Sequence, residues 1–233
     1  MNSLSIIESS IVSSEQDILQ LKEKTKGKIL VVSDSHGSVD ILKKIIRDFG
    51  EDCDALVFCG DGICDLVECL EDAKEDDRFV QVIPSAIMCA KGNCDGSQYP
   101  VHFANVLSET NPETEERQYL NVQPMVTLNV AGRNIVCVHG NRHSVDYGTD
   151  VLSSFTESMN ADMIFYGHTH QAHREEIGAT LILNPGSCSR PRGGLPPTFA
   201  VVSFPGGTER YDVEFFEVKE TLFGGYSFAP FPF

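Results

Sequence analysis

Two histidines follow a short apolar segment in the second half of the chain. Residues 162–166, Asp-Met-Ile-Phe-Tyr, have the composition of a buried strand, and Gly167 allows a sharp turn where that strand ends. The turn brings His168 and His170 near one another. Imidazole is the commonest nitrogen ligand for divalent transition metals, but a metal site needs more than two ligands. The spacing therefore predicts part of a metal site whose other ligands lie elsewhere in the chain.

Four other apolar segments also end in polar residues beside or near a glycine. These residues are Asp34, His36, Asp61, Asn93 and His139, and they follow the segments 28–33, 55–59, 86–90 and 134–138. Taken singly, Asp34 is as well explained as a helix cap and His36 as a loop residue. Together with His168 and His170 the set is too large for one tetrahedral ion. It suits two octahedral-like ions about 3.5 to 4 Å apart, with Asp61 as the carboxylate that bridges them.

Strands and helices alternate in the part of the chain that carries these residues. Apolar segments 28–33 and 55–59 are typical of buried strands, and segments 39–49 and 65–73 have the spacing of amphipathic helices. In open α/β sheets, ligands collect at the carboxyl ends of the strands. Further along we expect a helix at 149–159 and three hairpins, formed by residues 124–138, 172–183 and 198–218. Residues 96–123, with acidic residues at 113–116, are predicted to form a surface excursion that could flank a substrate cleft.

Size and charge restrict the class of function. The chain of 233 residues fits one domain, and its net charge of −16 opposes nonspecific binding to nucleic-acid backbones or anionic membranes. It has no apolar run long enough to cross a bilayer, and residues 1–12 lack the pattern of a signal peptide, so we expect a cytoplasmic protein. Its eight cysteines show no Cys-x-x-Cys spacing that would indicate a zinc knuckle.

The sequence divides into three parts. Residues 1–27 are predicted to be an N-terminal helical extension, with Ser14 as a possible cap, and residues 28–218 to be the domain itself. Residues 219–233 form a tail rich in Phe, Gly and Pro, without periodicity. The tail either packs on the domain or binds a partner. A homo-oligomer or a protein partner could use the N-terminal helix or this tail.

The ordered motifs resemble the metal-binding signature of the calcineurin-like metallophosphoesterases. The motifs are Asp34-x-His36, Gly60-Asp61, Gly92-Asn93, His139 and Gly167-His168-x-His170. Residues 184–187, Asn-Pro-Gly-Ser, are similar to the small bacterial and archaeal phosphodiesterase branch. The resemblance implies an α/β fold of two mixed β-sheets packed as a sandwich with flanking helices. It also implies one ion held by Asp34, His36, Asp61 and His170, and a second held by Asp61, Asn93, His139 and His168.

The implied activity is hydrolysis of a phosphodiester by a hydroxide that bridges the two ions, because metal coordination lowers the pKa of water to about 7 in favourable cases. The cations would hold the anionic substrate locally despite the acidic surface. Mixed Asp, Asn and His ligands suit manganese, our first choice, and also nickel, iron, cobalt or zinc. The expected catalytic residues are Asp61, Asn93, Cys94 and Asp95.

The chain departs from the family pattern beside the metal ligands. Many relatives have a histidine after the motif asparagine, where it protonates the leaving group; here Cys94 stands in its place, as it often does in the small phosphodiesterases. A thiol is a mediocre donor at neutral pH, so we expect aryl esters to turn over better than alkyl esters. Asp95, with no imidazole beside it, is expected to face solvent. Asn141 replaces a second histidine after Gly140, and His143 lies two residues further on.

Two alternatives to a phosphodiesterase stay open. One is a protein-interaction scaffold like the retromer subunit that shares this fold, and the other is a phosphomonoesterase or phosphoprotein phosphatase. Arg190 and Arg192 either grip a phosphate oxygen of the substrate or lie on the surface beside a proline-rich loop.

Overall fold

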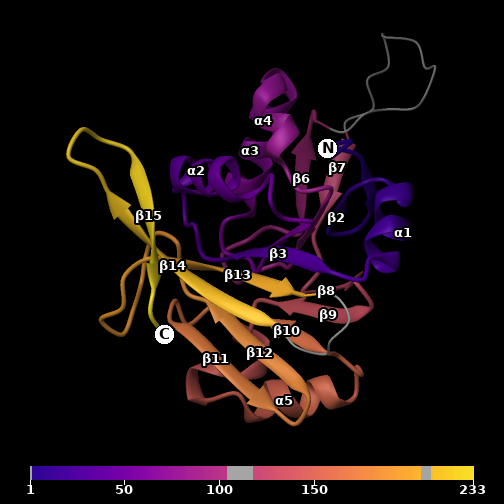
Figure 1. The fold of residues 1–233 in the computed structure, drawn as a ribbon, viewed down its shortest axis with the longest axis vertical. Coiled ribbons are helices and arrows are strands. Elements are labelled where there is room, and N and C mark those ends of the chain that lie inside the picture. Colours follow the sequence, from indigo (N-terminus) through magenta and orange to yellow (C-terminus); the bar gives the residue numbers. More distant parts are fainter. Residues whose placement is uncertain (1, 104–117, 206–210) are drawn as a thin grey trace.

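The computed structural model describes residues 2–103, 118–205 and 211–233. Within these ranges the chain forms two mixed sheets packed face to face (Figure 1). The larger sheet has eight strands in the order β1-β2-β5-β4-β3-β13-β14-β15. Their bounds are β1 (Ile6–Glu8), β2 (Ile11–Val12), β3 (Gly27–Val32), β4 (Ala55–Phe58), β5 (Ala86–Cys89), β13 (Thr198–Phe204), β14 (Asp212–Glu220) and β15 (Tyr226–Phe231). Strands β3, β4 and β5 run parallel, and the other pairs are antiparallel.

The smaller sheet has five strands among the described residues, in the order β11-β12-β10-β9-β8. Its members are β8 (Met125–Val130), β9 (Arg133–Val138), β10 (Met163–Phe165), β11 (Ala172–Ile177) and β12 (Thr180–Pro185). The central strand β10 is parallel to both β9 and β12. Strands β6 (Gln98–Val101) and β7 (Gln118–Asn121) form a separate pair.

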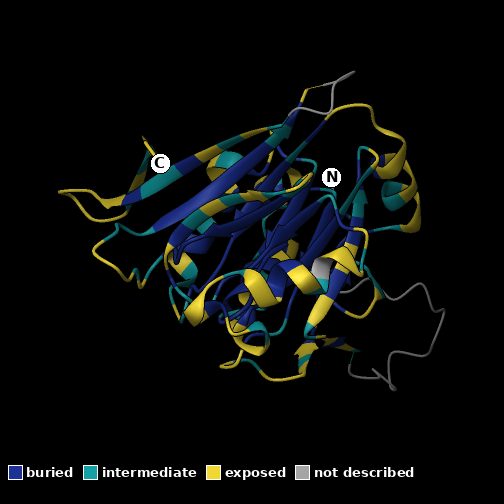
Figure 2. Ribbon diagram, turned by 90° about the horizontal axis from the view of Figure 1, so that it is seen from below, coloured by how far each residue is buried: buried dark blue, intermediate teal, exposed yellow. Residues whose placement is uncertain are grey.

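The alternation of side chains along each strand divides the core into layers. Ile29 and Val31 of β3 pack between the two sheets, against residues such as Phe165 of β10. Leu30 and Val32 of the same strand point to the opposite face, which is covered by α2 (Val39–Phe49), α3 (Ile63–Glu75) and α4 (Asp77–Val82). The outer face of the smaller sheet is covered by α5 (Asp150–Glu157). Figure 2 shows buried strands inside and helices exposed on their outer sides. The predicted sandwich with flanking helices is confirmed.

The N-terminal residues are more than a helical extension. The predicted helix is present as α1 (Glu15–Glu23), and the Ser14 hydroxyl accepts a hydrogen bond from the Asp17 N–H at 3.0 Å. Before it, however, β2 pairs with β5 and so extends the larger sheet. Ile11 and Val12 are buried in that sheet. The prediction missed this strand because two residues are too few to show any periodicity.

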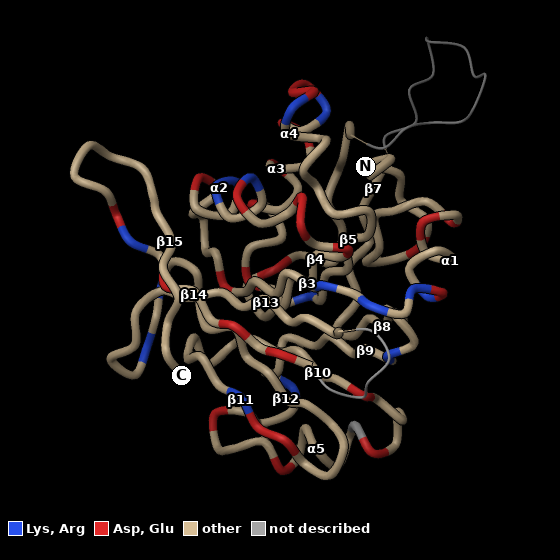
Figure 3. Tube along the Cα trace, in the orientation of Figure 1, with Lys and Arg blue, Asp and Glu red and all other residues tan. Residues whose placement is uncertain are grey.

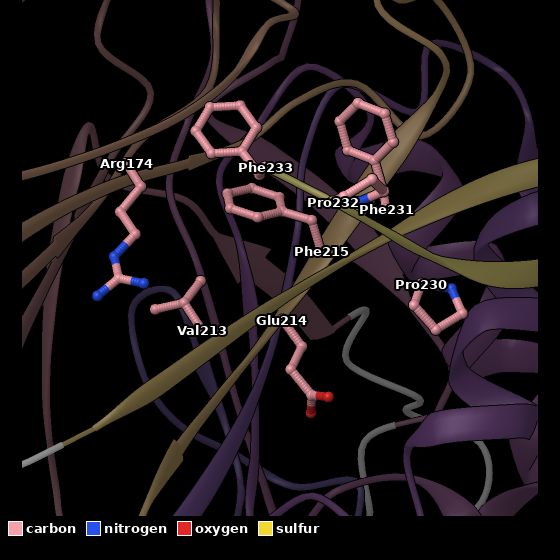
Figure 4. A pocket seen from close by; sticks show the side chains of 8 residues that line it. All are labelled: Arg174, Val213, Glu214, Phe215, Pro230, Phe231, Pro232 and Phe233. Carbon is pink, nitrogen blue, oxygen red and sulfur yellow. The ribbon is translucent and has the colours of Figure 1, made fainter.

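The C-terminal tail packs on the domain. Its strand β15 pairs antiparallel with β14, and Phe228 packs edge-on against Phe49 and Phe199. Strand β15 thereby becomes one edge of the larger sheet. A groove of about 340 Å³ lies beside it, lined by phenylalanines such as Phe231 and Phe233 and also by Arg174 and Glu214 (Figure 4). None of the predicted site residues lines this groove.

The predicted surface excursion at 96–123 contains the paired strands β6 and β7, so its described part is not wholly irregular. The acidic cluster at 113–116 lies outside the described residues. Asp and Glu residues, red in Figure 3, are spread over helices and strands of the described part of the chain. Within the described residues, no helix combines the length and apolar character that a membrane span requires.

Candidate metal centre

The candidate ligands stand where strands of both sheets end. Asp34 follows β3 and Asp61 follows β4 in the larger sheet, whereas His139 follows β9 and the Gly167 turn follows β10 in the smaller sheet. Since the two sheets face each other, these four strand ends meet at one end of the sandwich. Side chains separated by more than one hundred residues in the sequence, such as Asp34 and His170, therefore lie within a few ångströms of one another.

The backbone at these positions is unusual. Ten residues other than glycine have a positive φ among the described residues, and half of them are candidate ligands: Asp34, His36, Asp61, His168 and His170. This conformation costs free energy in residues with a Cβ, and such strain gathers at functional sites where the surrounding contacts hold it. The strain thus marks these strand ends independently of the residue types.

Three ligand side chains form a first cluster. The Asp34 Oδ1 atom lies 3.2 Å from His170 Nε2 and 3.7 Å from His36 Nε2. The two Nε2 atoms of His36 and His170 are 3.0 Å apart. All three donor atoms lie within 4.8 Å of one another, which is close enough for one cation to bind them together.

Asp61 connects this cluster to a second one. Its Oδ2 atom lies 3.4 Å from His139 Nε2 and 3.9 Å from His36 Nε2. Asp34, Asp61 and His139 also have donor atoms within 4.8 Å of one another. The structure therefore brings five of the seven predicted ligands into overlapping clusters, and Asp61 has the position expected of a shared carboxylate.

The buried donor atoms fit a cation. Among the described residues, Asp34 Oδ1 and His139 Nε2 are two of four buried polar side-chain atoms without a hydrogen-bond partner. The His139 Nδ1 atom donates to the Cys59 carbonyl at 2.7 Å, and His170 Nδ1 donates to the Arg190 carbonyl at 2.6 Å. Because a carbonyl only accepts, each of these rings directs the lone pair of Nε2 into the site. Leaving such atoms unpaired in the interior costs free energy, which a bound cation would recover.

His168 and Asn93 lie beside these clusters. The His168 ring packs edge-on against the His139 ring with 5.2 Å between centroids, while its Nε2 atom lies 3.0 Å from Asp146 Oδ2. Asn93 is exposed, and its amide donates to Cys94 Sγ at 3.3 Å. Among the described residues, the clusters of His, Cys, Asp and Glu donors do not include His168. The roles of His168 and Asn93 as metal ligands therefore stay predictions.

Asp95 organises the loop that carries Asp61. Its carboxylate accepts four backbone hydrogen bonds of 2.7 to 3.0 Å, donated by the N–H groups of Asp61, Gly62, Ile63 and Gly92. The expectation that Asp95 faces solvent is therefore wrong. Two of these donors lie at the start of α3, where the helix dipole also favours negative charge. Asp95 therefore stabilises the conformation of the loop that carries Asp61.

Two further contacts hold the Asp34 loop, and neither residue that makes them was among the predicted site residues. Asp65, in the first turn of α3, accepts hydrogen bonds from the Ser35 hydroxyl and from the Gly37 N–H. Ser187, in the 184–187 motif, donates to the Asp34 carbonyl at 2.6 Å. Both side chains are buried. An acidic residue that opens a helix after a motif loop is the local signal that could have pointed to Asp65.

Asn184 holds the loop that carries the two histidines. Its side-chain amide donates to the Gly167 carbonyl at 2.7 Å, and its oxygen accepts the Gly186 N–H at 2.9 Å. A side chain at Gly167 would overlap Ser33 Oγ, so only glycine lets this loop approach β3 so closely. The 184–187 motif therefore supports two loops of the metal centre. Ser187 holds the Asp34 loop, and Asn184 holds the loop of the two histidines.

Electrostatics favour an ionised Asp61. Burial pushes the pKa of Asp61 upward, but the neighbouring His139 imidazole and the Cys94 N–H outweigh it and hold this pKa well below its ordinary value. Burial lowers the pKa of His139, yet the Asp61 and Asp34 carboxylates raise it overall. The pKa of His36 is lowered, mainly because the ring is buried. At neutral pH the centre therefore offers an anionic oxygen between imidazole nitrogens.

The remaining predicted residues lie around the rim. Arg190 and Arg192 are both exposed, and the charge of Arg190 is close enough to contribute to the lowered pKa of His36. The Arg192 N–H donates to the His170 carbonyl at 3.1 Å. His143 lies against the Phe155 ring, 4.7 Å away between centroids, and belongs to none of the clusters of potential ligands among the described residues.

We expect the replacement of Asp146 with alanine to weaken metal binding. Asp146 contacts His168 Nε2, so its carboxylate would keep a proton on that nitrogen and orient the ring. Loss of such a partner typically weakens binding about 10- to 100-fold. Titration of the metal-free protein with Mn²⁺ measures the effect. The exposed Glu157 of α5, replaced with alanine, is the control, and equal affinities in the two variants would contradict this role.

Known proteins resemble this chain over most of its length. The family profile described as calcineurin-like phosphoesterase superfamily domain matches residues 28–206. The probable metallophosphoesterase YsnB of Bacillus subtilis is 26% identical over 175 residues, which cover 75% of this chain and 83% of YsnB. The phosphodiesterase MJ0936 of Methanocaldococcus jannaschii is 26% identical over 170 residues, covering 72% of this chain and 89% of the relative.

Solved structures share the fold. Vacuolar Protein Sorting 29 from Cryptosporidium parvum superposes with a TM-score of 0.59 over 88% of this chain and 98% of its own. Its sequence identity to this chain is 16%, so the likeness concerns the fold alone. It does not decide between an enzyme and a scaffold.

Proposed function

Because the chain belongs to the calcineurin-like phosphoesterase superfamily, we propose that it is a phosphodiesterase that uses two divalent transition-metal ions. One observation carries this proposal. Two buried atoms, Asp34 Oδ1 and His139 Nε2, have no hydrogen-bond partner, and both belong to clusters of potential metal donors that Asp61 connects. Leaving such atoms unpaired in the interior costs free energy, and a bound cation would offset that cost.

The ligands divide between the two ions as the family resemblance implies. The first ion would be held by Asp34, His36, Asp61 and His170, whose side chains already cluster. The second would be held by Asp61, Asn93, His139 and His168. For the second ion, support comes from the pairing of Asp61 with His139 and from the His168 ring beside it. Manganese is our first choice of metal.

When bound, the ions would supply Lewis acidity, which acidifies water and offsets the charge that develops on phosphoryl oxygens. The protein's own residues orient the reaction. The carbonyls of Cys59 and Arg190 hold His139 and His170 in the required tautomer. Asp95 keeps the Asp61 loop in place, and the exposed Arg190 and Arg192 can bind a phosphate oxygen. Cys94 stands where a proton donor to the leaving group would be needed.

The test is turnover by protein of known metal content. Protein stripped with a chelator should not hydrolyse an aryl phosphodiester, and reloading with Mn²⁺ should restore turnover together with two ions per chain. Two bound ions without turnover of any ester would favour the scaffold. Faster hydrolysis of the monoester than of the diester would favour the phosphomonoesterase. The cytoplasmic location and a protein partner stay predictions.

Replacing Cys94 with histidine is expected to raise the turnover of alkyl phosphodiesters. Cys94 is exposed at the centre, and burial and the nearby Asp61 raise the pKa of its thiol above the ordinary value. A thiol with a raised pKa is a poor proton donor, so poor leaving groups suffer most. A positioned general acid contributes about 10²-fold or more, and we expect at least about a tenfold gain on alkyl esters. Aryl esters, measured in parallel, should change little. An unchanged ratio of alkyl to aryl rates would contradict the prediction.

A further inference from the structure

We propose that the tip of the β14–β15 hairpin, residues 221–225, docks into the groove beside β15 of a second copy of this chain. The second copy returns the same contact, so the two chains form a two-fold dimer. The hairpin lies beyond the family match, which ends at residue 206. The inference therefore concerns a surface apart from the metal centre and does not depend on the proposed function.

The tip presents two apolar side chains to solvent. Leu222 and Phe223 are 99% and 101% exposed, although both are of a kind that proteins usually cover. The turn that carries them is ordered: the Thr221 N–H donates to the Gly225 carbonyl at 3.0 Å, and the Thr221 hydroxyl donates to the Gly224 carbonyl at 2.6 Å. The hairpin projects away from the body of the domain (Figure 1). Leu222 and Phe223 are thus held in a position where another molecule can cover them.

The composition of the tail is that of an interface. Residues 221–233 include four phenylalanines and no Asp, Glu, Lys or Arg, in a chain with a net charge of −16. Three of the eight exposed large hydrophobic side chains among the described residues lie in this segment. The cores of protein interfaces are depleted in charge and enriched in aromatic residues. Two copies of an acidic chain also repel each other least where they meet through an uncharged surface.

The groove lies at an open edge of the sandwich. One wall is Arg174 of β11, in the smaller sheet, and the others belong to β14, β15 and the residues that follow β15. Phe215 and Phe231 are paired across β14 and β15, and both face the space between the two sheets. The Phe233 ring lies 4.7 Å from the Phe215 ring between centroids and is 61% exposed (Figure 4). The groove therefore offers aromatic surface to an apolar side chain.

The tip of one chain cannot fill the groove of the same chain. Strands β14 and β15 pair without a register shift from Phe215 opposite Phe231, at the groove, to Glu220 opposite Tyr226, near the tip. These five steps keep the two ends of the hairpin about 17 Å apart. Only a different molecule can bring such a tip to this groove.

A second copy has both of the required surfaces. Because the tip and the groove lie at opposite ends of one hairpin, two hairpins placed antiparallel bring each tip to the groove of the other chain. Such a contact is self-complementary and closes on two molecules. An exposed Phe and Leu offer roughly 300 Å² of surface, and the groove that receives them loses a similar area. Two such contacts bury on the order of 1,200 Å², which is the lower limit for a specific interface.

Strand pairing between the two copies is not required. β15 is the last strand of the larger sheet among the described residues, but Pro230 on this edge has no N–H to donate. Proline at a sheet edge opposes the addition of a further strand. Side chains of the tip and the groove, and not backbone hydrogen bonds, therefore carry the contact.

Sedimentation equilibrium of the full chain tests the proposal. We expect a reversible dimer, and the double substitution Leu222→Ser and Phe223→Ser should weaken dimerisation at least about 100-fold. Both side chains are exposed and remote from the metal centre, so the Tm, the metal content and the turnover of the monomer should stay unchanged. The control is Leu19→Ser on α1, where the side chain is 63% exposed, and this variant should dimerise like the unmodified chain.

A mixing experiment tests the reciprocal contact. Phe233→Ser alters the groove and leaves the tip intact, and it should also weaken dimerisation. Neither the tip variant nor the groove variant can form an intact contact with a second copy of itself. In a mixture, the intact tip of the groove variant meets the intact groove of the tip variant. The mixture should therefore dimerise more strongly than either variant alone.

Three results would overturn the proposal. The first is a chain that stays monomeric at high concentration; if it then sediments with phosphatidylcholine vesicles, the tip binds a membrane surface instead. The second is a dimer that survives the double substitution at the tip. The third is a mixture no more dimeric than its components, since the tips would then contact something other than the groove. Metal content and turnover are measured on the same samples, so a failure of the dimer is distinguishable from a failure of the proposed function.

Discussion

Replacing Asp61 with asparagine is expected to lower kcat/KM for an aryl phosphodiester at least about 100-fold, which corresponds to about 2.7 kcal/mol of transition-state stabilisation. Asparagine keeps the shape of the side chain and removes the charge. The Asp61 carboxylate lies within 4 Å of both His36 and His139, so its charge acts on both sides of the centre. The variant should also retain fewer than two ions per chain, as measured by elemental analysis.

A remote acidic residue provides the control. Asp48 is exposed on α2, where it pairs with Lys44, and Asp48→Asn should leave turnover and metal content unchanged. Circular dichroism of Asp61→Asn should match that of the unmodified protein, since the loop is held by Asp95. Two ions and full turnover in Asp61→Asn would refute its role as the shared ligand.

Replacing Asp95 with alanine is expected to destabilise the fold as well as the centre. Four backbone N–H groups, including that of Asp61, lose their acceptor at once. Hydrogen bonds to charged groups contribute about 1.5 to 3 kcal/mol each, but water can replace part of the loss at a half-buried site. We therefore expect a loss of about 3 kcal/mol and, for a chain of this size, a drop in Tm of roughly 6 to 12 °C.

Thermal unfolding of the metal-free protein measures this effect apart from metal binding. The matched control is Asp52→Ala, because Asp52 is exposed in a turn, and its Tm should stay within about 1 °C of that of the unmodified protein. Metal-free Asp95→Ala with an unchanged Tm, but with lost turnover, would show that Asp95 takes part in the chemistry and does not position the loop.

Much of the candidate site could be predicted because its signals are local. An apolar run followed by a polar residue and a glycine marks a strand end, and that pattern located Asp34, Asp61, His139 and His170, which the structure brings together. Short strands such as β2 carry too little pattern to be recognised. A local signal could have pointed to Asp65, but the partners of Asp65 and Asp146 lie 20 residues or more away in the sequence, so no local pattern identifies those partners.

The sequence by itself determined the residue types available at the strand ends and the order of the motifs, because these are properties of the chain, and the family resemblance of those motifs implied the layered fold. Only the tertiary structure decided which of those side chains share a cluster and which ones hold the loops in place. Asp95 shows the difference, since its surroundings in the sequence leave it without a partner and the folded chain surrounds it with backbone donors. The physical reason is that hydrogen bonds and ion pairs depend on distances in space, and folding alone sets the distances between remote segments.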